Sequence, residues 1–302
     1  MERAAEEPLV AQPQAILAAA AAGARLDRIV PQCSCPSCAG AGNAAESPSW
    51  IYAIGKIEAR FPNLAIEKEY MQVLGRTETS SLTDRQALHA VLSKPENRYL
   101  ARRVCWVMTI EGLETYLLYP RDSADMTLLI EAVRENPEPG DLDVVIGSKG
   151  PIAPPSLCNG LQLPVVAFDQ VYSLDRDTLI QAIPKPGETA KEEFSRTAAE
   201  LFDRLMQMAD NAGATDEHRA LNYLAVRYPA VYSTTSDAFT RNLSLESIDV
   251  HQSPLSTTRN IVEVVFSFRN RVTDVAEKFF TRVDVSDQFP FLVTKMSPYF
   301  DR

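Results

Sequence analysis

The sequence predicts an α+β fold. Its 302 residues divide into three stretches by the spacing of their apolar positions. The first stretch mixes short helical and extended segments, and the second is helical. After Asn242 the apolar period changes from about 3.6 to about 2 residues. Strands and helices do not alternate regularly, which argues against a parallel α/β sheet and favours α+β.

The N-terminal half is expected to combine strands with short helices. Pro62 and Asn63 end a first strand, and Thr83 is a good N-cap because its hydroxyl can accept from the first free N–H groups of a helix. The expected strands are Trp50–Phe61, Val104–Ile110 and Thr115–Tyr119 (a hairpin), and Asp141–Ile146 and Leu163–Tyr172 on either side of a Pro/Gly-rich crossing, Gly147–Gly160. The expected helices are Leu64–Leu74, Asp84–Leu92, Pro95–Arg102 and one from Ser123 to Asn136.

A helix pair is expected at the centre of the chain. Glu192–Ala212 is the clearest helix, and Gly213 is expected to close it. Its apolar residues recur at helical spacing: Phe194, Leu201, Leu205 and Met208. Thr215 caps a second helix that runs to Tyr228, where Pro229 is expected to stop it.

The C-terminal part is expected to be an antiparallel β meander. In the run Asp274–Val285, alternating apolar and polar residues allow one buried and one solvent-exposed face. The expected strands are Ile248–His251, Asn260–Arg269, Asp274–Val285 and Phe291–Lys295, and short helices over Asp175–Ala182 and Ser236–Asn242 flank the helix pair. The predicted order is therefore a mixed α/β N-terminal half, a central helix pair and a C-terminal meander.

Composition excludes several classes of function. Hydrophobic residues make up 45% of the chain, and 40 acidic against 30 basic residues give a net charge of −10. This charge disfavours binding to nucleic-acid phosphates. No apolar run approaches the roughly 18 residues of a membrane span. Glu2, Glu6 and Glu7 stand where a signal peptide needs positive charge. We therefore expect a cytoplasmic protein that binds neither nucleic acid nor membrane.

The chain is predicted to hold one domain after an N-terminal tail. Residues 1–32 are Ala-rich and acidic, with little large apolar surface to offset the entropy of ordering, so they are expected to be a flexible tail. Residues 33–302 are assigned to a single domain whose compact part begins near Ser49.

The cysteines give the strongest local signal for chemistry. Five cysteines in a cytoplasmic chain favour metal or free thiols over a disulfide framework. A structural zinc needs four ligands, and the Cys35-Pro-Ser-Cys38 knuckle supplies two. Cys158 lies in a constrained Pro/Gly loop that suits a ligand. The predicted zinc ligands are Cys35, Cys38, Cys105 and Cys158, with Cys33 as the substitute. Cys105 as a small buried hydrophobe, and free thiols or a redox pair, stay open as alternatives.

Catalytic motifs are scarce in the sequence. It holds three histidines, His89, His218 and His251, and no signature joins any of them to a cysteine. The polar segment Asp210–Arg219 could do acid–base work, but a helix end at Gly213 and a helix cap at Thr215 explain it more simply. We find no phosphate loop, dinucleotide fingerprint, nucleophile elbow or zinc-protease motif. The sequence thus favours a non-enzyme and assigns no catalytic residue.

Several long blocks carry a family resemblance. They are Ile54-Gly-Lys-Ile-Glu-Ala-Arg-Phe61, Leu82-Thr-Asp-Arg-Gln-Ala-Leu88, Asn97 through Tyr116, Asp143 through Pro155, Cys158-Asn-Gly-Leu161, Phe168-Asp-Gln-Val-Tyr172, Leu205 through Tyr223, and Phe289 through Arg302. Together they resemble the domain of unknown function at the C-termini of the cyanobactin maturation proteins PatA and PatG. The resemblance runs from about Cys35 to the C-terminus.

The resemblance implies a pathway and no reaction. The family's domain has no established activity and is fused to subtilisin-like proteases that act on a precursor peptide. We assemble no Ser/His/Asp triad here, so protease activity is not carried over. The family's cysteine pattern keeps Cys105 in the zinc set and leaves Cys33 out.

The expected function follows from the resemblance and the cysteines together. We expect a zinc-stabilised accessory module in the biosynthesis of ribosomally synthesised, post-translationally modified (cyanobactin-like) peptides. Its expected partners are the precursor peptide or maturation enzymes such as the subtilisin-like protease, and homodimerisation stays open. The alternative is a peptide-modifying enzyme that uses the cysteine-bound metal or Asp210–Arg219.

Overall fold

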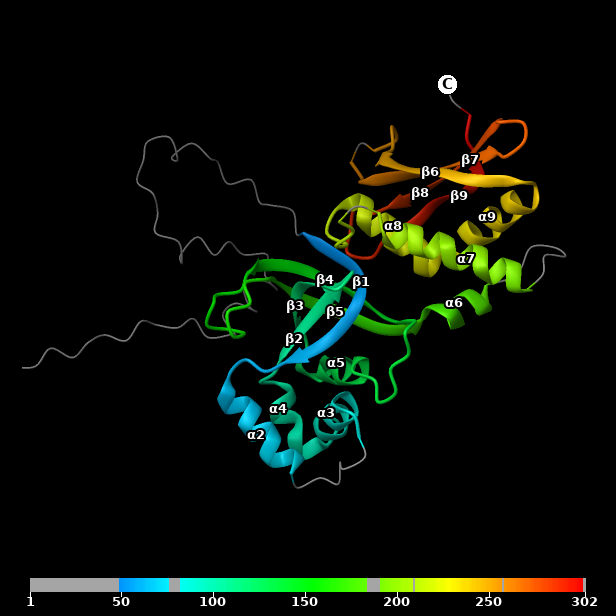
Figure 1. Cartoon of the computed structure of the whole chain (residues 1–302). Helices are drawn as coiled ribbons and strands as arrows, with labels where there is room; N and C mark the ends of the chain where they lie inside the picture. Colours follow the sequence, from blue (N-terminus) through cyan, green and yellow to red (C-terminus); the bar gives the residue numbers. More distant parts are fainter. Residues whose placement is uncertain (1–48, 76–81, 184–190, 209, 257, 301–302) are drawn as a thin grey trace, which may run out of the picture.

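Two β-structures make up the described part of the chain, together with helices between them and further helices on the far side of the first (Figure 1). The computed structural model describes residues 49–75, 82–183, 191–208, 210–256 and 258–300. The expected tail, residues 1–32, and the cysteines Cys33, Cys35 and Cys38 lie outside these ranges. The tail and the knuckle therefore stay predictions.

The first β-structure is a closed barrel with the strand order β1-β2-β3-β5-β4. Its strands are β1 (Trp50–Arg60), β2 (Cys105–Ile110), β3 (Leu113–Pro120), β4 (Asp141–Ile152) and β5 (Pro164–Asp175). β2 and β3 form the predicted hairpin, and the turn residues Glu111 and Gly112 both have positive φ. All neighbours are antiparallel except β3 and β5, which pair in parallel and close the barrel.

One side of the barrel is covered by four short helices: α2 (Leu64–Leu74), α3 (Asp84–Leu92), α4 (Arg98–Ala101) and α5 (Met126–Ala132) (Figure 1). The cap predicted at Thr83 is confirmed, because its side chain accepts from the Gln86 N–H while the Gln86 side chain accepts from the Thr83 N–H. Apolar residues of these helices and of the barrel form one buried cluster that includes Trp106 and Phe168.

The opposite side of the barrel carries α6 (Arg176–Ala182), α7 (Lys191–Met206), α8 (Asp216–Arg227) and α9 (Ala230–Thr240). Beyond them lies the antiparallel sheet β6-β7-β8-β9, formed by Leu243–Gln252, Ile261–Asn270, Ala276–Asp284 and Phe291–Pro298 (Figure 1). One buried cluster joins barrel, helices and sheet, with Tyr52, Phe202, Leu224 and Phe266 among its members. The predicted α+β class and C-terminal meander are confirmed. None of the described helices is long and apolar enough to cross a lipid bilayer.

Several boundaries differ from the sequence prediction, and the largest differences are those of α7, α9 and β4. α7 ends at Met206 and not at Ala212, because the following backbone is bound to the barrel. α9 begins directly after Pro229, well before the expected Ser236. Proline lacks an N–H that a helix start does not need, so it can begin one helix where it ends another. β4 continues to Ile152, through residues assigned to an irregular crossing.

Candidate functional site

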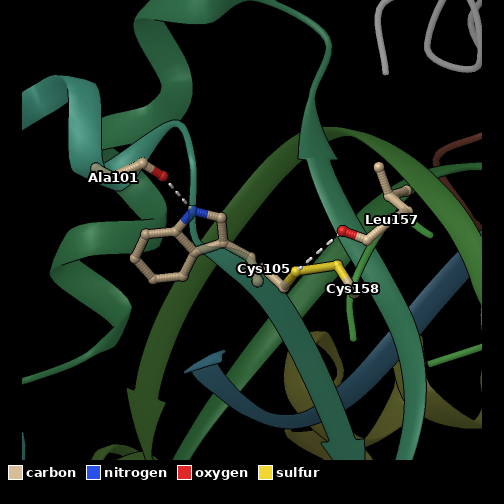
Figure 2. The surroundings of a disulfide bond; sticks show 5 residues. Ala101, Cys105, Leu157 and Cys158 are labelled. Atoms are coloured by element: carbon tan, nitrogen blue, oxygen red, sulfur yellow. Dashed lines mark hydrogen bonds between the residues drawn. A yellow bond between two sulfur atoms is a disulfide. The ribbon is translucent and has the colours of Figure 1, made fainter. Parts of the chain in front are cut away.

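The structure brings Cys105 and Cys158 together. Cys105 begins β2, Cys158 lies in the loop between β4 and β5, and a disulfide with an S–S distance of 2.02 Å joins them (Figure 2). Their exposed fractions are 4% and 2%, and they lie in a small apolar cluster with Val107, Leu117 and Val165. The indole N–H of Trp106 donates to the Ala101 carbonyl over 2.9 Å and fixes the start of β2 against α4.

This pair is half of the predicted zinc site. A disulfide sulfur carries no thiolate charge, so the pair cannot bind zinc in the bonded form that the structure shows. The other two predicted ligands, Cys35 and Cys38, lie outside the described residues. Within the described ranges no group of three or more His, Cys, Asp or Glu residues is placed to hold a metal ion. The four-cysteine zinc site therefore stays a prediction.

Hydrogen bonds of the polar segment Asp210–Arg219 and of Asn222 join the helices to the barrel. The carbonyl of Gly213 accepts from the Tyr52 N–H of β1 over 2.9 Å. The amide of Asn222 donates to the Tyr52 carbonyl over 2.8 Å, and Asn211 donates to the Asn222 side-chain oxygen over 2.7 Å. Asn211 and Asn222 are buried, so these bonds satisfy the amide N–H groups of both side chains, which water cannot reach.

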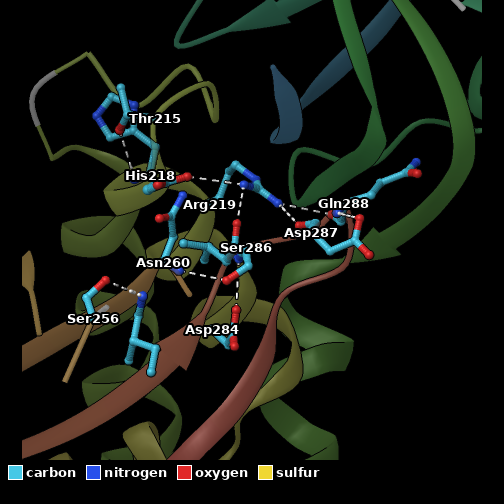
Figure 3. Close-up of polar contacts among 12 residues, drawn as sticks. Thr215, His218, Arg219, Ser256, Asn260, Asp284, Ser286, Asp287 and Gln288 are labelled. Atoms are coloured by element: carbon cyan, nitrogen blue, oxygen red, sulfur yellow. Dashed lines mark hydrogen bonds and ion pairs between the residues drawn. The ribbon is translucent and has the colours of Figure 1, made fainter. Parts of the chain in front are cut away.

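Arg219 extends the same junction to the sheet (Figure 3). Its side chain is 3% exposed and donates to the carbonyls of Val285 over 2.8 Å, of Gln288 over 3.3 Å and of Asp287. Asp216 lies 3.2 Å from its guanidinium, and burial raises the pKa of Asp216 although Arg219 acts in the opposite direction. Arg219 therefore clamps the β8–β9 loop to α8.

The same loop also contacts the barrel. The Gln288 amide donates to Asp169 of β5 over 2.6 Å, and Arg121 holds that carboxylate from the other side. Thr215 caps α8 as predicted, by accepting from the His218 N–H. The contacts of the segment thus agree with its interpretation as structural.

The histidines lie on elements that carry neither Cys105 nor Cys158, the two cysteines that the structure describes. His89 is in the last turn of α3 and His218 is in α8, both in helices as predicted. His251 is on β6, with its Nε2 3.3 Å from the Glu263 carboxylate. These positions place no histidine on an element that carries Cys105 or Cys158.

A groove of about 440 Å³ opens where β1 parts from β4. Residues 50–55 of β1 pair with β4, whereas residues 56–60 pair with β2. Gly55 lies at the change of partner, where a Cβ would stand 2.3 Å from the Thr109 carbonyl oxygen. We name this hollow the seam groove; it is lined by Ile54, Gly55, Lys56, Glu58, Thr109, Glu111, Gly112, Pro139, Gly140, Leu142, Arg176, Phe202, Asp203 and Met206.

Asp143 stabilises the point at which β1 stops pairing with β4. Its carboxylate accepts from the Ile57 N–H over 2.9 Å and from the Ser173 hydroxyl over 2.5 Å. The Ile57 N–H would otherwise lack a partner from β4, because the β1–β4 ladder ends at Gly55. Burial raises the pKa of the Asp143 carboxyl, although both hydrogen bonds act to lower it. The seam is therefore a built feature of the barrel.

The seam groove has both apolar and charged residues in its lining. Its volume and its mixture of apolar walls with a few charged groups are typical of sites for small or extended ligands. Among the lining residues Phe202 and Met206 are buried in the core, Leu142 is partly exposed, and Lys56 and Glu111 are exposed and charged.

Comparisons with known proteins find similarity to the same domain in sequence and in structure. Residues 188–299 match the family model described as PatG C-terminal. A solved structure, described as the PatG domain of unknown function, shares 19% sequence identity with a TM-score of 0.67, over 84% of this chain and 99% of that chain. The chain resembles the PatG C-terminal domain in sequence and in fold. A search of curated proteins finds no match.

The PatG resemblance inferred from sequence blocks is thereby confirmed, through the family model for the helices and the sheet and through the fold for the barrel as well. Sequence reasoning missed the seam groove of this PatG-like chain. Its lining comes from β1, the β2–β3 hairpin, residues 139–142, α6 and α7, and only α6 and α7 follow one another in the chain. No local motif could have signalled it.

Proposed function

We propose that the chain is a non-catalytic, peptide-binding accessory module in the biosynthesis of cyanobactin-type modified peptides. The PatG resemblance supports the pathway, and the seam groove is the observation that supports peptide binding. An extended precursor segment fits an open groove beside a strand that changes partner. The rival, a peptide-modifying enzyme built on Asp210–Arg219, is disfavoured because its polar groups are already bonded: Asn211 to Asn222 of α8, Gly213 to the barrel and Arg219 to the β8–β9 loop.

A blocking substitution tests the peptide-binding proposal. Lys56→Trp places a large ring at the exposed rim of the seam groove and is expected to weaken binding of the precursor peptide by about 10-fold, the effect of roughly 1.4 kcal/mol. Fluorescence anisotropy with a labelled precursor peptide measures the change. Because Lys56 is exposed, the melting temperature of the variant should stay close to that of the parent protein.

Lys68→Trp is the matched control, because Lys68 is exposed on α2 and does not line the groove. Equal binding by the two variants would remove the seam groove from the proposal. Conversion of the peptide, seen by mass spectrometry with this chain as the sole protein added, would favour the enzyme hypothesis instead.

The proposal includes a structural zinc held by Cys35, Cys38, Cys105 and Cys158. Reduction of the Cys105–Cys158 bond would free two buried thiols at one place, which suits half of a tetrahedral sulfur site. Zinc bound there would add to the folding free energy, because the unfolded chain has no preformed site.

Protein purified under reducing conditions is expected to hold about one equivalent of zinc by elemental analysis, as a closed four-sulfur site requires. Cys38→Ser should remove the metal and lower the melting temperature without any substrate present. Thiol titration provides the counter-test. A metal-free, fully folded protein in which Cys105 and Cys158 are oxidised would show that the disulfide is the working state of the pair.

A further inference from the structure

A second hollow, of about 520 Å³, lies on the other flank of α7. We name it the arginine groove. It is lined by residues of α7, α9 and the start of β6, together with Arg271 after β7: Glu200, Leu201, Asp203, Arg204, Gln207, Thr235, Phe239, Ser244, Leu245 and Arg271. Its charged residues are two arginines and two acids, and one of those acids is already neutralised, since Asp203 lies 3.2 Å from Arg176.

Both arginines of this groove are oriented without an acidic partner. Arg204 donates to the Leu245 carbonyl of β6 over 2.7 Å. The Arg271 guanidinium lies 5.7 Å from the centre of the Phe239 ring. Among the residues that the structure describes, neither forms an ion pair with a carboxylate. Neighbouring arginines do, since Arg241 is 2.6 Å from Glu277 and Arg269 is 2.8 Å from Glu246.

The two hollows share one lining residue. Asp203 of α7 lines both the seam groove and the arginine groove. An extended chain bound in the seam groove would have to pass Asp203 to reach the arginine groove. The arginine groove offers two guanidinium groups, which match a carboxylate with short, charge-assisted hydrogen bonds.

We propose that the arginine groove is a carboxylate-binding site, at which Arg204 and Arg271 hold an acidic group of an extended peptide whose remainder lies in the seam groove. This inference rests on the proposed peptide-binding function and deepens it. Glu200 competes for the same cations, because it lies four residues before Arg204 on α7, at the spacing of a helical ion pair. The groove thus has a built-in competitor whose removal should tighten binding.

Three labelled forms of the precursor peptide test the inference: one with a free C-terminal carboxylate, one with a C-terminal amide, and one with its acidic side chains changed to amides. We expect one of the two carboxylate sources to improve binding by about 10-fold over its amide counterpart, as for hydrogen bonds to charged groups. The form that loses affinity identifies whether the C-terminal carboxylate or an acidic side chain of the peptide is bound.

Variants locate the effect. Arg271→Gln should reduce the preference for the carboxylate to less than about 2-fold, and Glu200→Gln should raise it by about 2-fold, the effect of one helical ion pair. Arg102→Gln is the matched control, since Arg102 is exposed after α4 and lines neither groove.

Two results would overturn the inference. One is equal binding of all three peptide forms. The other is a carboxylate preference that survives both Arg204→Gln and Arg271→Gln. Failure of every form to bind at millimolar concentration would instead defeat the proposed peptide-binding function, and this inference with it.

Discussion

Arg219→Met is expected to lower the free energy of unfolding by about 3 to 5 kcal/mol, the cost of breaking a buried charged hydrogen-bond network. Arg219 donates to three backbone carbonyls of the β8–β9 loop, at Val285, Asp287 and Gln288. Methionine fills similar space but donates nothing, so these acceptors and the Asp216 carboxylate lose their partner. Thermal unfolding should show a melting temperature lower by on the order of 10 °C.

Arg102→Met is the control, because it removes an exposed arginine and should change stability by no more than about 0.5 kcal/mol. Arg219→Lys should recover little, since one ammonium cannot reproduce a guanidinium that serves several acceptors. A stable Arg219→Met protein that had lost its effect in peptide maturation would contradict the structural role and return Asp210–Arg219 to the enzyme hypothesis.

The local elements of this fold could be predicted from the sequence. The cap at Thr83, the β2–β3 hairpin and the change of period after Asn242 each depend on neighbouring residues, and each is confirmed. Closure of the barrel depends on the parallel pairing of β3 with β5, which brings Leu117 beside Val165. Such long-range pairing leaves no periodic trace in either strand, so the sequence alone could not predict it.

The candidate site, too, could be predicted only in part from the sequence. The chemistry of Cys105 and Cys158 and the family resemblance assign both to one site, and the structure brings them together as a disulfide. The two grooves could not be predicted, because their lining residues belong to no sequence motif. Lys56 and Leu142 line the seam groove and Arg271 lines the arginine groove, and residues of α7 line both. The single domain assigned to residues 33–302 stays a prediction.

Gly213→Ala is the second large expected effect. Gly213 has a φ of +71°, and a Cβ there would stand 2.3 Å from the Tyr52 carbonyl oxygen and 2.7 Å from the Ala53 Cα. Both are backbone atoms of β1, so the clash cannot be relieved by turning a side chain. Relief requires the connection before α8 to move away from the barrel, which breaks the hydrogen bond from the Tyr52 N–H to the Gly213 carbonyl.

Gly112→Ala separates the cost of backbone strain from the cost of the steric clash in Gly213→Ala. Gly112 has a φ of +79°, but a Cβ there would meet no atom within 4 Å. Its replacement should cost only the left-handed backbone term, about 1 to 2 kcal/mol. We expect Gly213→Ala to cost at least about 2 kcal/mol more, as overpacking in a rigid site does. Chemical unfolding of both variants measures the difference. Equal losses would mean that the α7–α8 connection yields freely, and that the contact of Gly213 with β1 does not hold the helices to the barrel.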